Sequence, residues 1–133
     1  MKKILLAYDG GEPARKALAQ AIDFAKSCNA ELGVISVVPT RPGRMPVDPW
    51  DDRTVHAEEL LEARKTLREA GIEPTLIEPG GDPAKTIERV AEERGYDTII
   101  IGSRGLGTVA RTLQGSVSEH VAANARATVI VVR

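Results

Sequence analysis

Two short segments rich in glycine and serine could hold a phosphate group: residues 102–105 (Gly-Ser-Arg-Gly) and residues 115–118 (Gly-Ser-Val-Ser). The first follows a short β-branched run, residues 97–101, and nine residues separate it from the second. Glycine lets backbone N–H groups approach a ligand closely, and the hydroxyls of Ser116 and Ser118 can donate further hydrogen bonds where a helix begins. Because the start of a helix favours an anion, the sequence predicts a cradle for nucleotide phosphates.

The glycine pattern differs from the two best-known phosphate loops. A Walker A loop needs Lys and then Ser or Thr after its last glycine, whereas Ser116 follows Gly115 directly. A dinucleotide fingerprint follows the first strand, whereas these glycines follow the fourth. The alternative is that Gly102 and Gly105 only allow a loop to turn. That alternative does not explain why glycine and hydroxyls recur at the start of the next helix.

Asp9 is the candidate metal ligand. It follows the first apolar run, and in an open α/β sheet ligands bind beyond the carboxyl ends of the strands. If the first and fourth strands are neighbours, Asp9 and Gly102 flank one crevice. A carboxylate facing phosphate then implies a divalent cation such as Mg²⁺ between them. The alternative is that Asp9 caps the following turn or helix, as aspartate commonly does.

The elements that must position these residues alternate along the chain. Apolar runs at residues 4–8, 32–38, 75–77, 98–101 and 128–132 are predicted strands, and helical segments separate them. This order predicts an α/β fold with a parallel sheet covered by helices on both faces. The predicted helices begin after Pro13, near Thr54, at an Asp82 cap and at Ser116. The second of them is expected over residues 54–70, with Leu60, Leu61, Arg64 and Leu67 among many charged residues and Gly71 as its stop.

One long irregular segment interrupts this pattern. Residues 39–53 hold four prolines and the single tryptophan, so we expect a loop, either a flap over a ligand or a passive excursion. His56 and His120 lack metal-ligand spacing, and we expect surface or helix-end roles for both. Arg104 and Arg111 could pair with phosphate or lie in solvent. Cys28 is expected to be a buried, unreactive thiol.

Composition limits the classes of function. A chain of 133 residues fits one domain, residues 1–133, and its formal charge of −1 disfavours nucleic acid as a partner. No apolar run approaches the roughly 20 residues that a membrane span needs, so no membrane association is expected. A single cysteine excludes an internal disulfide framework and agrees with a reducing cytoplasm, where we expect the protein to act.

The motif Gly102-x-x-Gly105, nine residues, Gly115-Ser116 resembles the ATP-binding signature of the universal stress protein family. The opening residues 4–10 resemble the first strand and Asp-Gly turn of that family, and residues 127–133 resemble its last strand. The resemblance covers essentially the whole chain. It implies a Rossmann-like domain with five parallel strands in the order 3-2-1-4-5, usually a homodimer, that binds ATP and a divalent metal, Mg²⁺ or Mn²⁺.

Carried over position by position, the resemblance places adenine near Ala7 and Val37. It places ribose and phosphates near a second group of residues: Asp9, Gly102, Arg104, Gly105, Gly115, Ser116, Val117 and Ser118. Three positions depart from the family's pattern. Ala7 stands where proline is common, Gly11 where serine or threonine is usual, and Ser36 where histidine is frequent. These departures concern the adenine side and the entry to the first helix, and they remove no phosphate donor.

Three functions remain open at this point. The first is an ATP-dependent regulatory module of the stress response, at most a weak ATPase, with a protein partner that the sequence does not identify. The second is a metal-dependent phosphoryl- or adenylyl-transfer enzyme, for which no positioned nucleophile is found. The third is a nucleotide-free dimeric interaction protein. A dimer is expected through the C-terminal edge strand, residues Val129, Ile130, Val131 and Val132.

Overall fold

The computed structural model describes residues 1–39, 53–103 and 113–133. Five parallel strands form the central sheet: β1 (Lys3–Ala7), β2 (Glu31–Ile35), β4 (Thr75–Ile77), β6 (Thr98–Gly102) and β7 (Thr128–Val132). Their order is β4-β2-β1-β6-β7, which is the expected order 3-2-1-4-5 when these five strands are counted along the chain. The predicted Rossmann-like α/β fold is therefore confirmed.

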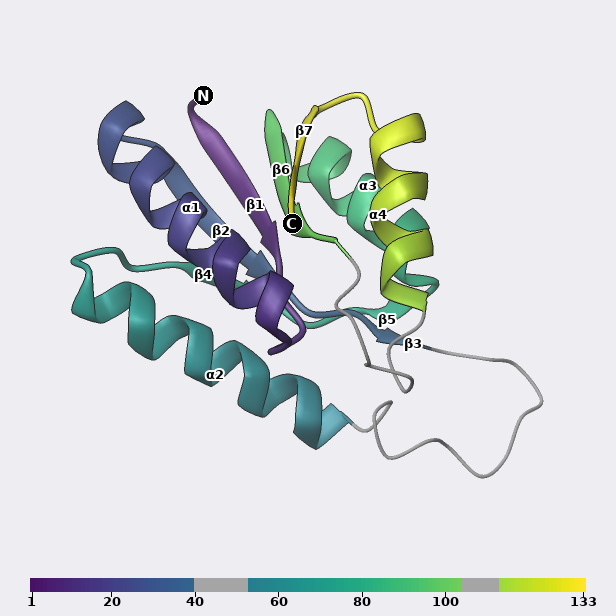
Figure 1. Ribbon diagram of the computed structural model, residues 1–133, viewed down its shortest axis with the longest axis horizontal. Helices are drawn as coiled ribbons and strands as arrows, with labels where there is room; N and C mark the ends of the chain where they lie inside the picture. Colours follow the sequence, from purple (N-terminus) through teal and green to yellow (C-terminus); the bar gives the residue numbers. More distant parts are fainter. Residues whose placement is uncertain (40–52, 104–112) are drawn as a thin grey trace.

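Within the described ranges, four helices cover the two faces of this sheet (Figure 1). They are α1 (Glu12–Cys28), α2 (Arg53–Glu69), α3 (Pro83–Arg94) and α4 (Leu113–Asn124). Alternate residues of β1 point to opposite faces. Ile4 and Leu6 pack with α1 and α2 in one core, whereas Leu5 and Ala7 pack with α3 and α4 in the other. The protein therefore has two apolar layers, one on each side of the sheet.

The second predicted strand is divided in the structure. The prediction of one strand over residues 32–38 is wrong, because β2 ends at Ile35 and β3 (Val38–Pro39) pairs in parallel with β5 (Gly80–Gly81) in a separate two-stranded sheet. Pro79 lies where the two sheets separate, and proline has no N–H to donate to a ladder. Pro39, expected in the long loop, is thus the last residue of a strand.

The predicted limits of α3 are confirmed. The Asp82 carboxylate accepts a hydrogen bond from the Lys85 amide at 3.1 Å, Pro83 occupies the first turn, and Gly95 ends the helix in the left-handed conformation. In α2, Leu60 and Leu67 are buried, whereas Leu61 is 49% exposed. Cys28 is exposed, so the prediction of a buried thiol is wrong.

Asp97 links the amino-terminal ends of β1 and β6 by hydrogen bonds. Its carboxylate accepts hydrogen bonds from the Thr98 hydroxyl at 2.7 Å and from the amides of Lys2 and Lys3, both at 2.9 Å. The hydrogen bond from Thr98 is the largest cause of a lowered pKa, and together these bonds hold the pKa of Asp97 below its usual value of 3.8. Because the pKa of Asp97 is lower in the folded than in the unfolded protein, its stabilising effect is complete when the pH lies above the unfolded-state pKa. The effect is lost as the pH falls through the folded-state pKa.

We therefore expect Asp97→Asn to lower the free energy of unfolding by about 1 kcal/mol at neutral pH, a modest figure because the side chain is exposed. The difference between wild type and variant should shrink as pH falls through and below the lowered folded-state pKa of Asp97, where both side chains are uncharged. Urea unfolding across this pH range measures it. Asp23→Asn, on the exposed face of α1, is the control and should change little at any pH. If the difference in free energy of unfolding between wild type and Asp97→Asn did not change with pH, the lowered pKa of Asp97 would be contradicted.

Candidate functional site

The carboxyl ends of three adjacent strands form the framework of the candidate site. Ala7, the last residue of β1, is in register with Ile35 of β2 on one side and with Ile101 of β6 on the other. The connection after β1 leads to α1 on one face, whereas α4, the helix that follows β6, lies on the other (Figure 1). This reversal makes the ends of β1 and β6 the topological switch point, where open α/β sheets bind ligands.

Gly102, at the end of β6, lies directly against the start of α1. A Cβ atom at this position would lie 2.6 Å from the carbonyl carbon of Pro13 and 2.8 Å from the amide nitrogen of Ala14. Both are backbone atoms, which cannot turn aside as a flexible side chain could. The structure therefore gives Gly102 a packing role that the sequence analysis missed. The absence of a side chain lets the first turn of α1 approach the switch point.

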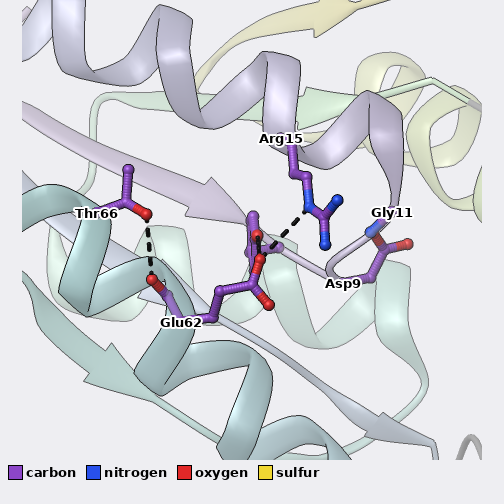
Figure 2. Close-up of polar contacts among 6 residues, drawn as sticks. Asp9, Gly11, Arg15, Glu62 and Thr66 are labelled. Atoms are coloured by element: carbon purple, nitrogen blue, oxygen red, sulfur yellow. Dashed lines mark hydrogen bonds and ion pairs between the residues drawn. The ribbon is translucent and has the colours of Figure 1, made fainter.

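Asp9 and Gly11 form a tight turn between β1 and α1. One carboxylate oxygen of Asp9 accepts a hydrogen bond from the Gly11 amide at 2.9 Å, and Gly10 between them has a φ of 78°. The alternative role foreseen for Asp9, capping its own turn, is therefore present in the structure (Figure 2). Within the described residues, no group of three His, Cys, Asp or Glu side chains could hold a metal ion. In the described parts of the chain, Asp9 is therefore not part of a preformed three-ligand metal site.

A polar contact joins α1 to α2 above this turn. The Tyr8 hydroxyl donates a hydrogen bond to the Glu62 carboxylate at 3.0 Å, and Arg15 of α1 lies 3.4 Å from the same oxygen (Figure 2). Burial first, and then the neighbouring Glu62 carboxylate, raise the pKa of Tyr8 to about 12. Tyr8 therefore keeps its proton near neutral pH and acts as the donor.

A buried polar cluster lies beside the same turn: Ser36, His56 and Glu59, each less than 8% exposed. His56 Nδ1 shares a hydrogen bond with Ser36 Oγ at 2.7 Å and lies 3.6 Å from Glu59 Oε1. His56 lies in the first turn of α2, so the predicted helix-end position holds, whereas the surface alternative is wrong because the side chain is buried. His56, Leu60, Ala63 and Leu67 are all buried at helical spacing, and this spacing was the signal available in the sequence.

The cluster does not have the geometry of a nucleophilic triad. In a triad the serine and the acid contact opposite nitrogens of the histidine ring. Here Ser36 and Glu59 both approach Nδ1 of His56. These contacts of Ser36 and Glu59 therefore fall on the same ring nitrogen, which is not the arrangement of a triad.

The residues predicted to contact adenine lie on one side of the sheet. Ala7 and Val37 are both buried in the core that α3 and α4 cover, and Val37 follows the end of β2 by two residues. Val117 of α4 packs against the same core, and Ser118 is buried with 4% of its surface exposed. The structure thus brings Ala7, Val37 and Val117 to one apolar layer below the carboxyl edge.

The last helix begins earlier than predicted. It starts at Leu113 rather than Ser116, so Gly115 and Ser116 lie in its first turn. In an α-helix the amides of the first turn have no carbonyl partner within the helix. This geometry moves the predicted amide donors towards Gly115 and away from Val117 and Ser118. The predicted site residues Arg104 and Gly105 lie outside the described residues, as do Arg111 and residues 40–52 of the predicted flap.

His120 lies on the surface, as predicted. Its Nδ1 is 2.8 Å from a carboxylate oxygen of Glu88, so a polar contact joins α4 to α3. None of the helices in the described parts of the chain has the length and apolar character required to cross a membrane.

Comparison with known proteins agrees with this architecture. The model of the universal stress protein family matches residues 1–133. A putative universal stress protein of Staphylococcus haemolyticus is 33% identical over 140 aligned residues, which cover 99% of this chain and 84% of the relative.

Solved structures of the same family share the fold. A universal stress protein from Archaeoglobus fulgidus, solved in complex with dAMP, has a TM-score of 0.70 and 25% identity, and the match covers 100% of this chain and 98% of the other. A universal stress protein solved in complex with cAMP has a TM-score of 0.77 and 22% identity, with 99% and 97% covered. The chain described here belongs to the universal stress protein family.

Proposed function

We propose that this protein binds an adenine nucleotide beyond the carboxyl ends of β2, β1 and β6, and that nucleotide binding regulates its contacts with a protein partner in the stress response. The observation that carries the proposal is the switch point itself. Ala7 lies in register beside Ile101, and Gly102 follows immediately with the first turn of α1 against it. Relatives solved with dAMP and with cAMP support a nucleotide as the ligand.

The predicted contact residues divide between the two ends of the ligand. Ala7 and Val37 would contact the base, because both belong to the apolar layer on the α3 and α4 side. The phosphates would lie over the first turn of α4, where Gly115 and Ser116 begin the helix. The full proposed set is Ala7, Asp9, Val37, Gly102, Arg104, Gly105, Gly115, Ser116, Val117 and Ser118.

ATP with Mg²⁺ or Mn²⁺ is the proposed physiological ligand. Asp9 would contribute one carboxylate oxygen to the metal, directly or through water, while its other oxygen keeps the hydrogen bond to the Gly11 amide. A metal held mostly by phosphate oxygens and water would stabilise negative charge on the phosphates. Slow ATP hydrolysis would then end the bound state, and this weak activity is the most that we propose.

Equilibrium binding tests the proposal. We would first identify the nucleotide released when the purified protein is denatured. Titrations would follow with ATP and AMP, each with and without Mg²⁺, and with GTP as a control for the base. ATP binding that is tighter than GTP binding and strengthened by Mg²⁺ is expected. No binding of any adenine nucleotide by nucleotide-free protein would overturn the proposal, and ADP release over hours would measure hydrolysis.

A homodimer through β7 is the proposed assembly. Among the described strands, β7 pairs with β6 alone and forms one edge of the sheet, and Val131 on it is 41% exposed. An apolar edge strand with free backbone groups favours pairing with a second copy. Light scattering at micromolar concentration should give twice the monomer mass, and a monomer would contradict this assembly. We propose the cytoplasm as the place of action, since the single cysteine needs no oxidising compartment.

A further inference from the structure

The buried cluster of Ser36, His56 and Glu59 connects two segments of the candidate site. Ser36 directly follows β2 and precedes Val37, a proposed base contact. Its backbone is fixed, because the Ser36 amide donates to the Ile77 carbonyl at 3.0 Å. Its hydroxyl shares the 2.7 Å hydrogen bond with His56 of α2. The base side of the site is thereby attached to α2.

The other end of the cluster reaches the turn after β1. The Glu59 side chain would lie 3.5 Å from a Cβ atom placed on Gly10, through both its Cγ and its Oε2. The Glu59 side chain therefore lines the space beside Gly10, in the turn that holds Asp9 and Gly11. One turn of α2, from His56 to Glu59, is thus hydrogen-bonded to Ser36 after β2 and lies beside the turn after β1.

Burial of these groups has an energetic cost. Glu59 and His56 are 7% and 6% exposed, and enclosing a carboxylate and an imidazole costs far more than enclosing apolar side chains of the same size. An apolar pair at positions 56 and 59 would extend the stripe of Leu60, Ala63 and Leu67 at no such cost. A fold-stabilising role alone does not account for polar residues here.

We propose that His56 and Glu59 are positioning residues for the nucleotide: they fix the distance between the base-side segment at Ser36 and Val37 and the phosphate-side turn at Asp9 and Gly11. This inference rests on the proposed nucleotide site. It predicts that the cluster matters most for ligands that contact both segments at once. AMP spans both, whereas adenosine lacks the phosphate.

Glu59→Ala tests the inference on the full chain. We expect its affinity for AMP to fall roughly tenfold, the size of effect that supporting residues of a site exert, and its affinity for adenosine to fall much less. The amide NMR signals of Gly10 and Gly11 should shift in the ligand-free protein. Glu59→Gln, which keeps the shape and one carbonyl oxygen, should recover most of the AMP affinity. Glu58→Gln, on the exposed side of the same turn, is the matched control and should behave as wild type.

Ser36→Ala gives a second, milder variant that deletes a single oxygen, in case Glu59→Ala does not fold. We expect an AMP loss of about threefold, again larger than the adenosine loss. An equal loss of AMP and adenosine affinity in either variant would show a merely structural role and overturn the inference. So would wild-type AMP affinity in Glu59→Ala with unchanged Gly10 and Gly11 signals. Failure of the wild-type protein to bind AMP would instead overturn the proposed function.

Discussion

Gly102→Ala is expected to lower the free energy of unfolding by about 2–3 kcal/mol, the largest stability effect that we predict for a single methyl group in this protein. The added Cβ would lie 2.6 Å from the Pro13 carbonyl carbon and 2.7 Å from its oxygen, so β6 and the first turn of α1 must separate. For a domain of this size the loss corresponds to roughly 10 °C in melting temperature. Because Asp9 and Gly11 lead into the same turn of α1, nucleotide affinity should fall as well.

Thermal unfolding followed by circular dichroism measures the first effect. Ser103→Ala, one residue further along the chain, is the control and should melt within a degree or two of the wild type. If Gly102→Ala melted like this control, the close approach of β6 to α1 would not be a constraint on the fold. The glycine would then be explained by the ligand alone.

The order of the elements could be predicted because each apolar run is short and is separated from the next by a segment of helical period, and the later runs are rich in β-branched residues. Both ends of α3 were predicted correctly. Asp82, Pro83 and Gly95 start and end the helix through contacts with residues close in sequence, so no distant partner is needed. The division of the second predicted strand was missed for the opposite reason. It depends on a distant segment, since the Val38 amide donates to the Pro79 carbonyl and β3 pairs with β5 rather than with the central sheet.

The buried cluster on α2 shows why part of the site could not be predicted. Histidine and glutamate on an otherwise charged helix indicate a solvent-facing surface, whereas in the structure His56 is buried and hydrogen-bonded to Ser36, the residue after β2. By the resemblance to the family, Ser36 stands where histidine is frequent. In the structure the imidazole in contact with this position comes from α2 instead. This contact depends on how α2 packs beside the end of β2, so it could not be recognised from the sequence.

The start of α4 was misplaced by three residues because Gly115 was interpreted as a residue preceding the helix. Glycine is a poor helix former, so a helical segment with glycine in its first turn has no strong local signal for its beginning. The position of Gly115 in the first turn of α4 supports the phosphate end of the proposed site. A first-turn glycine leaves its own amide free of an intrahelical carbonyl and leaves no side chain over that amide.

Gly115→Val is therefore expected to abolish nucleotide binding, by at least a hundredfold in the dissociation constant, while the protein remains folded. A branched side chain would occupy the space where the backbone is proposed to meet phosphate. Valine is a somewhat better helix former than glycine, so the substitution should not weaken α4. Titration with ATP and Mg²⁺ measures binding, and a melting temperature within a few degrees of the wild type establishes that the fold is intact.

Gly115→Ala and Ser116→Ala separate the two contributions to the proposed cradle. If close approach of the backbone dominates, Gly115→Ala should lose most of the affinity and Ser116→Ala should lose little. If the hydroxyl dominates, the order should reverse. Since the start of a helix attracts an anion through several amides at once, we expect the first result. Unchanged affinity in Gly115→Val would mean that phosphate does not lie over the first turn of α4, and the phosphate end of the proposed site would have to be placed elsewhere on the carboxyl edge.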